Sequence, residues 1–427
     1  MAEVAAAAPV INSGDTAWML ISTALVLFMT IPGLSLLYAG LIRAKNVLTV
    51  FMQCFAITAV VTVLWMLIGY SLAFDRTGMT DQVSGLSAFI GGFARVGLMG
   101  LTPDSVHPNA LTIPETVYCC FQLTFAIITP ALIISAFVER VKFSAVLLFT
   151  VLWSLVVYAP ICHMVWGGPG SWLGGRGVLD YAGGCVVEIN SGVSGLVAAF
   201  FAGRRKGYPQ QPMMPHSVAM AVAGGGLLWV GWFGFNAGSA VAANASAGLA
   251  MLNTHLAAAV GACTWMVIEW IRFKKPSALG AVTGSLAGLV VITPAAGFVA
   301  PLSAAALGLI ATSACYVACT WIKRRGGYDD SLDVFGVHGV AGLIGTLFLG
   351  VLGTTAWGGT ATTTPGHQLA LQAEAVLTTV LWAGGGTALC CLIVKLVVGL
   401  RVDERTEDAG LDLHQHGEVA YAMDDRT

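Results

Sequence analysis

The sequence predicts an all-α polytopic membrane protein, and three features of its composition lead to that fold class. Charged side chains make up only 10% of the 427 residues, hydrophobic ones make up 57%, and the mean hydropathy is +0.81. Soluble domains carry roughly 25% charged and 45–50% apolar residues, so this composition excludes a water-soluble enzyme. The 52 glycines agree with a membrane bundle, because small residues let helices approach closely in lipid. The net charge of −2 leaves no basic surface for nucleic acid, so the lipid bilayer is the expected partner instead.

Eleven apolar runs are long enough to span a bilayer, which takes about 20 residues. In chain order they cover residues 16–42, 46–74, 112–137, 143–165, 183–203, 215–237, 249–271, 277–293, 297–322, 334–355 and 369–399. An odd number of spans places the two ends of the chain on opposite sides of the membrane. The sequence therefore predicts about eleven transmembrane helices.

Lysine and arginine alternate sharply between successive loops. One set of loops carries fourteen of them: Arg43, Lys45, Arg140, Lys142, Arg204, Arg205, Lys206, Arg272, Lys274, Lys275, Lys323, Arg324, Arg325 and Arg401. The other set carries three: Arg76, Arg95 and Arg176. Because basic loops stay in the cytoplasm, we expect the N-terminus outside and the C-terminus inside.

The two halves of the sequence resemble each other. The matches are I-T-P-A at 128–131 and 292–295, a short A-G pattern at 38–40 and 236–238, and G-V-x-G-L at 192–196 and 339–343. Each pair lies five spans apart, so the halves would be inverted in the bilayer, as in many transporters. We therefore predict a membrane domain over residues 1–399, with a 5+5 inverted repeat at roughly 16–203 and 215–355 and a C-terminal helix at 369–399. Residues 400–427 form a separate cytoplasmic tail.

Ionisable residues inside a span are costly, so each is a candidate functional residue. Glu188 and His338 fall at similar places in the fifth and tenth spans, although aligning the glycine motifs leaves them about three residues apart. This pairing favours a shared role in a pore. Asp180 precedes the fifth span, where it could cap the helix or tune a nearby cation site. For His163, His255 and Glu374 we expect structural hydrogen bonds.

Aromatic residues gather at the outer ends of several spans: Phe121, Phe125, Trp166, Trp232, Phe233 and Phe235. They could form a lipid-anchoring belt or a cage that attracts a small cation by cation–π contact. The ten cysteines include no C-x-x-C pair, and Cys162, His163 and Cys185 lack the spacing of metal ligands. We therefore expect no metal site and no cofactor.

Seven sequence strings closely resemble ammonium transporters of the Amt/Mep family, in family order and along the whole chain. They are A-L-V-L-F-M-T-I-P-G-L-S-L-L-Y-A-G-L-I-R-A-K-N at 24–46, H-M-V-W-G-G at 163–168, D-Y-A-G-G at 180–184, G-W-F-G-F-N-A-G-S at 231–239, D-V-F-G-V-H-G-V at 333–340, and V-G-L-R-V at 398–402 followed by H-G-E-V-A-Y at 416–421. The resemblance implies transport of ammonium or methylammonium by a bacterial inner-membrane protein. It also implies a homotrimer with one pore in each subunit, plugged from inside by a PII-type regulator of the GlnK kind.

The resemblance assigns roles to individual positions. It matches an outer ammonium-recruiting site to Phe121, Phe125, Trp166 and Ser239, supported by Asp180. It matches the stacked rings of a pore gate to Phe125 and Phe235, and an ordered regulatory tail to Arg401, His416, Gly417 and Glu418.

One departure from the family pattern reaches the mechanism. His338 matches the second histidine of the family's twin-histidine pair, whereas Glu188 replaces the first, as in some fungal members. A bare ammonium ion cannot cheaply enter an apolar pore. We therefore expect Glu188 to accept a proton or stabilise the cation and His338 to relay it inward, with net movement of charge. The alternatives are an ammonium sensor on the same scaffold and, less favoured, an intramembrane enzyme. The latter lacks a nucleophile or metal set.

Overall fold

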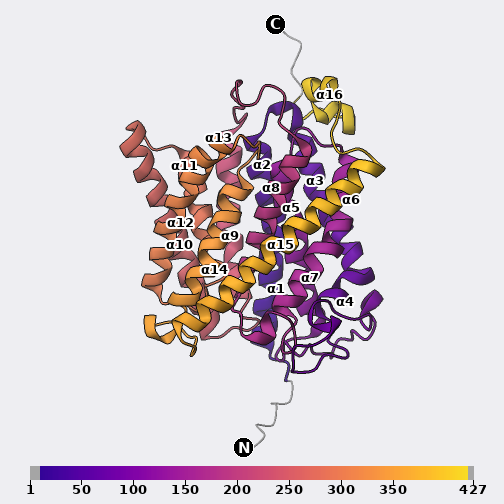
Figure 1. Cartoon of the computed structure of the whole chain (residues 1–427), viewed down its shortest axis with the longest axis vertical. Helices are drawn as coiled ribbons and strands as arrows, with labels where there is room; N and C mark the ends of the chain where they lie inside the picture. The colour runs from indigo at the N-terminus through magenta and orange to yellow at the C-terminus, as the bar shows by residue number, and fades with distance from the viewer. Residues whose placement is uncertain (1–9, 422–427) are drawn as a thin grey trace, which may run out of the picture.

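The computed structural model describes residues 10–421, and within that part of the chain the regular structure is helical, with two isolated β-bridges and no strand. The two termini leave the bundle at opposite ends (Figure 1). Ten helical segments in residues 10–421 are long and apolar enough to cross a membrane. They are Ser13–Leu41, Ala44–Phe74, Glu115–Ala136, Phe143–Trp166, Gly184–Ala202, Val218–Gly238, Ala245–Phe273, Pro301–Gly326, Phe335–Leu352 and Pro365–Val397. The predicted all-α membrane architecture is confirmed.

Several of these segments consist of two α-helices joined by a wider, π-helical turn. The α-helices are α1 (Ser13–Phe28), α2 (Ser35–Leu41), α3 (Val47–Leu64), α4 (Tyr70–Phe74), α5 (Glu115–Ile133), α6 (Phe143–Trp153), α7 (Ala159–Trp166), α8 (Asn190–Ala202), α9 (Val218–Gly238), α10 (Ala245–Phe273), α11 (Ala278–Ile292), α12 (Pro301–Val317), α13 (Lys323–Gly326), α14 (Val340–Leu352), α15 (Pro365–Val397) and α16 (Glu404–Ala409).

The eighth predicted span corresponds to α11, which is apolar but has only 15 residues. At 1.5 Å per residue it is about 22 Å long, shorter than the hydrocarbon core of about 30 Å. The count of eleven full spans therefore stays a prediction, and so does the orientation.

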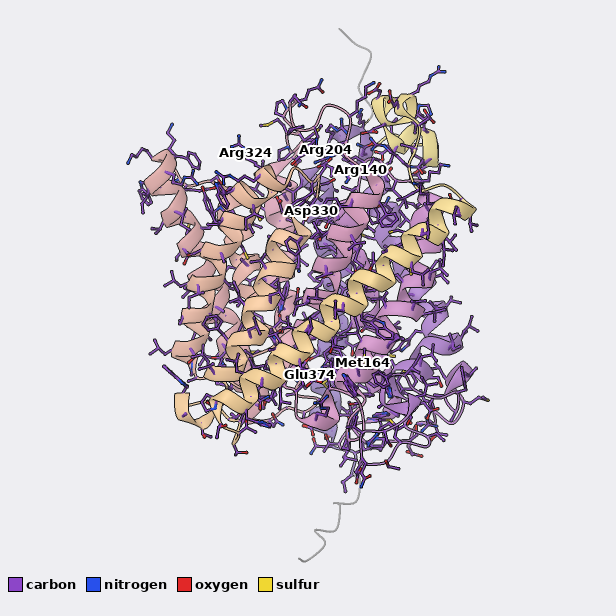
Figure 2. All side chains as sticks on the ribbon, in the orientation of Figure 1. Arg140, Met164, Arg204, Arg324, Asp330 and Glu374 are labelled. Carbon is purple, nitrogen blue, oxygen red and sulfur yellow. The ribbon has the colours of Figure 1, made fainter. Side chains whose placement is uncertain are left out.

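The arginine-rich loops gather at one end of the bundle. Arg140, Arg204 and Arg324 lie at the end where the chain finishes, and Glu374 lies at the opposite end (Figure 2). This agrees with the alternation of charge along the sequence. The C-terminal end is called inner below, and the N-terminal end outer, following the predicted orientation.

The two halves correspond to each other around the crossing of α8 and α14. A Cβ atom on Gly192 would meet the backbone of Gly339, and one on Gly342 would meet Glu188. Glu188 follows Asp180 by eight residues, and His338 follows Asp330 by eight. Each aspartate carboxylate caps the helical segment that follows it: Asp180 accepts from the N–H of Gly183 and its neighbours, and Asp330 accepts from those of Val334 and Phe335. Glu188 and His338 are therefore in register, and the predicted offset of three residues is wrong.

The long helix α15 crosses the bundle obliquely (Figure 1) and contacts α6, α8 and α14. At its outer end the Gln372 amide accepts from the backbone N–H of Leu179 at 2.9 Å and donates to the Leu179 carbonyl at 2.7 Å. Past its inner end the chain turns back into the tail.

The tail is described as far as residue 421, and it packs against the inner end of the bundle. The Asp412 carboxylate accepts from the backbone N–H groups of Leu48 and Thr49, and Asn46 Oδ1 accepts from the N–H of Leu411. Residues 422–427 of the predicted tail lie outside the described residues.

A buried charge network lies beneath the tail, where the inner loops meet. Glu139 binds Arg205 and Arg43, both at 2.8 Å or less, and Arg205 also binds Asp329 at 2.8 Å. Burial alone would raise the pKa of Glu139 and of Asp329, but the guanidinium groups outweigh it and hold both pKa values below their usual range. The network joins the loops after α2, α5, α8 and α13.

Candidate functional site

A cavity of about 430 Å³ opens at the outer end of the bundle. Phe121 and Phe125 of α5, Trp166 at the end of α7, and Ser239 at the end of α9 line it together with Asp180. The structure thus brings together all five residues predicted for the outer site. The Ser239 hydroxyl donates to the Phe235 carbonyl at 2.8 Å, so its lone pairs stay available as acceptors in the cavity.

The floor of this cavity is a set of aromatic rings. The rings of Phe125 and Phe235 pack at an angle of 45° with centroids 4.4 Å apart, and Phe125 makes T-shaped contacts with Phe121 at 5.0 Å and with Trp166 at 5.5 Å. Phe121, Phe125 and Phe235 are each only 1% exposed, so these rings do not form a lipid-facing belt. Trp232 lies deeper and donates through Nε1 to Thr293, and Phe233 lies outside the cavity.

Asp180 holds the outer cavity through backbone contacts. Its carboxylate accepts from four N–H groups, those of Gly183 to Val186, at 2.6–3.4 Å. Burial raises the pKa of Asp180 above its usual range, although these hydrogen bonds lower it in part. Its carbonyl accepts from Trp166 Nε1 at 2.9 Å, which fixes the indole ring at the cavity wall. The capping role is therefore present, and the same side chain lines the outer cavity.

Below the rings, Glu188 and His338 meet in the middle of the bundle. The Nδ1 atom of His338 lies 2.7 Å from Glu188 Oε2, in a hydrogen bond between buried side chains. Within residues 10–421 the other carboxylate oxygen, Oε1, has no hydrogen-bond partner. Both residues line a narrow apolar cavity of about 10 Å³ together with Leu228, Trp232 and Phe235.

A third cavity, of about 190 Å³, lies on the inner side of this pair. His338 lines both it and the narrow cavity, so its ring stands between them. Asp333 and Ser331 line the inner cavity, and Asp333 pairs with Lys323 at 2.8 Å. The three cavities therefore follow one line through the bundle, closed by the rings and by the Glu188–His338 pair.

Sequence reasoning missed Gln122, which lines the outer cavity from α5. It is only 7% exposed, and within the described chain its Oε1 has no hydrogen-bond partner. A polar side chain one position after Phe121 in an apolar run was the available signal. Such an acceptor can bind an N–H group that enters the cavity.

The three polar residues for which structural hydrogen bonds were expected, His163, Glu374 and His255, have different environments. The ring nitrogens of His163 lie 2.9 and 2.8 Å from the carbonyls of Ala73 and Ser87, so the expected structural role is present. Glu374 forms an ion pair with Arg176 at the outer end. The expectation for His255 is wrong: it is exposed on α10, because Thr254 and Ala257 turn inward. It packs on Trp229, and within residues 10–421 its side chain forms no hydrogen bond. Among residues 10–421, no three His, Cys, Asp or Glu side chains gather as a metal site requires.

Comparison with known proteins identifies the scaffold. Residues 17–421 match the model of the Ammonium Transporter Family. The chain is 45% identical to an ammonium transporter of Aquifex aeolicus (strain VF5) over 419 residues, covering 97% of this chain and 94% of the relative. Its fold is similar to Mep2 of Saccharomyces cerevisiae, with a TM-score of 0.85, 32% identity and coverage of 98% and 93%. It is also similar to a structure described as a sensor Amt protein, with a TM-score of 0.85, 28% identity and coverage of 94% and 98%.

Proposed function

Because the chain belongs to the ammonium transporter family, we propose that ammonium crosses it along the line of three cavities and that Glu188 and His338 control the passage. The observation that carries this proposal is the bond between them, which closes an otherwise apolar path. The family shows that the protein is a multi-pass ammonium transporter. The route, the role of each residue and the movement of charge are proposals.

The outer cavity is the proposed recruiting site. Aromatic faces attract a cation, and the acceptors Ser239 and Gln122 can replace part of the water shell of an ammonium ion. The rings of Phe125 and Phe235 close the cavity from below and act as the proposed gate, which excludes hydrated ions.

We expect Trp166→Leu to weaken the apparent ammonium affinity about fivefold, because one cation–π contact is worth about 1 kcal/mol. The concentration dependence of ammonium-evoked current in proteoliposomes measures this. Trp357→Leu is the matched control, since Trp357 is an exposed tryptophan that does not line the cavity. An unchanged half-saturating concentration in Trp166→Leu would remove the indole from the recruiting site.

Ammonium passes the narrow cavity as two species, neutral ammonia and a proton, that travel separately. A bare cation there would lose its hydration without compensation. Glu188 lines this cavity, and within residues 10–421 its Oε1 has no hydrogen-bond partner, so this oxygen can accept a proton from the incoming ion, which leaves ammonia. Ammonia crosses the apolar segment, and the proton moves from Glu188 to His338 and on to the inner cavity. One proton and one ammonia then arrive for each ammonium recruited, so the overall step carries charge.

Uptake of radiolabelled methylammonium separates transport from the sensor alternative. The sensor protein with this fold is 28% identical, whereas the transporter relative is 45% identical, which favours transport. Uptake in cells that express the protein, with no uptake in the empty host, is the expected result. Current recorded with and without ammonium then tests the movement of charge.

The proposed assembly is a homotrimer in a bacterial inner membrane, regulated at its inner face by a PII-type protein of the GlnK kind. The packing of the tail against the inner end of the bundle supports a docking surface there. Arg401 binds Glu407 at 2.6 Å, and the ring of His416 contacts Phe143. The trimer would present three such surfaces to a trimeric partner of the same symmetry.

We expect truncation after Val402 to abolish co-purification with the PII protein of the host, because the packed part of the tail is lost. Truncation after Tyr421 is the control, since it keeps every tail contact described above. Pull-down with tagged transporter, at matched amounts of folded protein, measures the retained partner. Undiminished binding by the shorter chain would show that the tail is not required for docking.

A further inference from the structure

The turn that follows α9 forms part of the wall of the outer cavity. Ser239, the first residue after the helix, and Val241, two positions later, both line this cavity of about 430 Å³. The next helix, α10, begins at Ala245, so the connection between the two helices is short. The backbone conformation of this turn therefore decides where the Ser239 hydroxyl lies relative to a cation in the cavity.

The backbone of the turn is strained at Val241, whose φ angle is +55°. A side chain that is branched at Cβ collides with its own backbone in this left-handed region, so valine rarely adopts it. Of residues 10–421 other than glycine, five have a positive φ angle, and Val241 is the one among them that is branched at Cβ. Such strain persists where surrounding contacts fix the backbone, and it concentrates at binding sites. Contacts from outside the turn must therefore stabilise it.

Two other elements supply these contacts. From α1, the Asp15 carboxylate accepts from the backbone N–H of Ala243 at 2.8 Å, two residues beyond Val241. From the loop before α8, the Tyr181 hydroxyl lies 2.8 Å from that of Ser246, in the first turn of α10. Hydrogen bonds to a charged group are stronger than those between neutral groups, so we assign the larger share to Asp15.

The position of Asp15 is itself fixed, because α1 packs closely along the end of α9. A Cβ atom on Gly238, the last residue of α9, would come within 2.7 Å of Ser22 Cβ in α1. The indole Nε1 of Trp18 donates to a carbonyl in the last turn of α9 at 3.3 Å. Asp15 lies about one helical turn before Trp18, so its carboxylate projects from a helix that cannot easily move away from the turn.

We propose that Asp15 is a positioning residue of the outer recruiting site: its bond to the Ala243 N–H stabilises the strained conformation at Val241 and thereby places Ser239 in the cavity wall. This inference rests on the proposed recruiting function of that cavity. Without the bond, the strain is released and the turn is competent to bind for only part of the time. The apparent affinity for ammonium then falls by that fraction. At saturating ammonium, binding itself restores the competent turn, so the maximal current is retained.

The test measures ammonium-evoked current in proteoliposomes with matched amounts of the folded, full-length chain. Asp15→Ala should raise the half-saturating concentration roughly fivefold, if about a fifth of the turns stay competent, and keep the maximal current within about twofold of the wild type. Asp15→Asn retains an oxygen that can accept from the Ala243 N–H, so it should restore an affinity within about twofold of the wild type. Asp104→Ala removes the same charge from an exposed outer loop and should leave the half-saturating concentration unchanged.

A double-variant measurement separates strain from other effects of losing the carboxylate. Glycine adopts a positive φ angle without collision, so in a Val241→Gly background the turn no longer depends on the bond to Asp15. In that background Asp15→Ala should raise the half-saturating concentration less than about twofold. Leu98→Gly is the matched control background, because Leu98 also has a positive φ angle, of +56°, but does not line the outer cavity. There the full effect of Asp15→Ala should remain.

Hydrogen exchange of the wild type gives a test that needs no variant. Ala243 is an exposed residue, yet its bonded amide should exchange slowly with solvent deuterium. Exchange as fast as that of an unbonded loop amide would contradict the proposal.

Three results with the variants would overturn it: wild-type affinity in Asp15→Ala, an Asp15→Asn variant as weak as Asp15→Ala, or an undiminished effect of Asp15→Ala in the Val241→Gly background. The Trp166→Leu variant distinguishes this failure from a failure of the recruiting site. If Trp166→Leu weakens the affinity and Asp15→Ala does not, the recruiting site stands and the role of Asp15 is wrong. If neither variant changes the affinity, both proposals are wrong.

Discussion

Replacing Glu188 with glutamine should reduce ammonium-evoked current roughly 100-fold or more, because a positioned proton-transfer group typically contributes 10²–10⁴-fold. Glutamine has nearly the same shape and can still contact His338, which lies 2.7 Å from the carboxylate. It cannot accept a proton at the position of Oε1. The substitution therefore removes the proton transfer while it preserves the packing of the buried pair. Current from proteoliposomes with matched amounts of folded protein measures the effect.

Two further variants make this result specific. Glu374→Gln also removes a carboxylate from a span, but Glu374 pairs with Arg176 at the outer end and lines none of the three cavities. Its current should equal that of the wild type. Glu188→His restores two histidines and should keep transport with an altered pH dependence. If Glu188→Gln conducts as well as the wild type, Glu188 has no part in the mechanism.

Replacing Arg205 with methionine should cost about 3–5 kcal/mol of stability, because it leaves Glu139 and Asp329 buried with one fewer cation. Methionine keeps the aliphatic length of the side chain. Arg204→Met is the matched control: Arg204 is exposed, and among residues 10–421 it donates only to the Gly327 carbonyl, so its loss should change stability little. Thermal unfolding in detergent compares the two variants.

The pH dependence gives an independent check. In the wild type the folded pKa values of Glu139 and Asp329 lie below their unfolded values of about 4, so these groups stabilise the fold above that pH and the contribution is lost on acidification. In Arg205→Met the carboxylates are less well compensated, and protonation relieves a buried charge. The deficit of the variant should therefore shrink between about pH 8 and about pH 5. A deficit that grows on acidification would show that the network is not the source of the instability.

The sequence predicted the spans and the meeting of Glu188 with His338 because both depend on hydrophobicity and on the internal repeat. The sequence comparison placed the two helices about one turn out of register, because the glycine before α14, Gly339, has no glycine counterpart in the first repeat. When the repeats are aligned on their aspartates, Gly339 corresponds to Ile189 and Gly342 corresponds to Gly192. The G-V-x-G-L match instead aligned Gly339 with Gly192, which shifted the alignment by three residues. Glycines at a helix crossing occur where the two backbones touch, so their spacing along the sequence is a poor guide to which residues of the two repeats correspond.

The environment of the aromatic residues and the contacts of the tail could not be predicted from the sequence, for a different reason. Whether an aromatic residue such as Phe121 faces lipid or a cavity depends on which helices surround it, and composition does not record that. Likewise the tail has the charge of a solvated segment, yet Asp412 finds a partner at the start of α3 and Glu407 finds one in the loop after α8, each more than 200 residues away. Such contacts appear only when the fold brings the loops together.

The oblique course of α15 also has a mechanical consequence. Its 33 residues extend about 50 Å, across both repeats, and no proline interrupts them after the first position. Near its outer end Gln372 Nε2 donates to the carbonyl of Thr346 in α14, in the second repeat, at 3.3 Å, and at the other end Lys142, in the first repeat, binds the carbonyl of Val398 at 3.0 Å. A continuous helix does not stretch, so it acts as a diagonal brace: the two repeats cannot rock against each other without changing the distance between its anchored ends. We therefore expect the substrate to travel through a stationary frame, with opening confined to side-chain movements at the rings and at the buried pair.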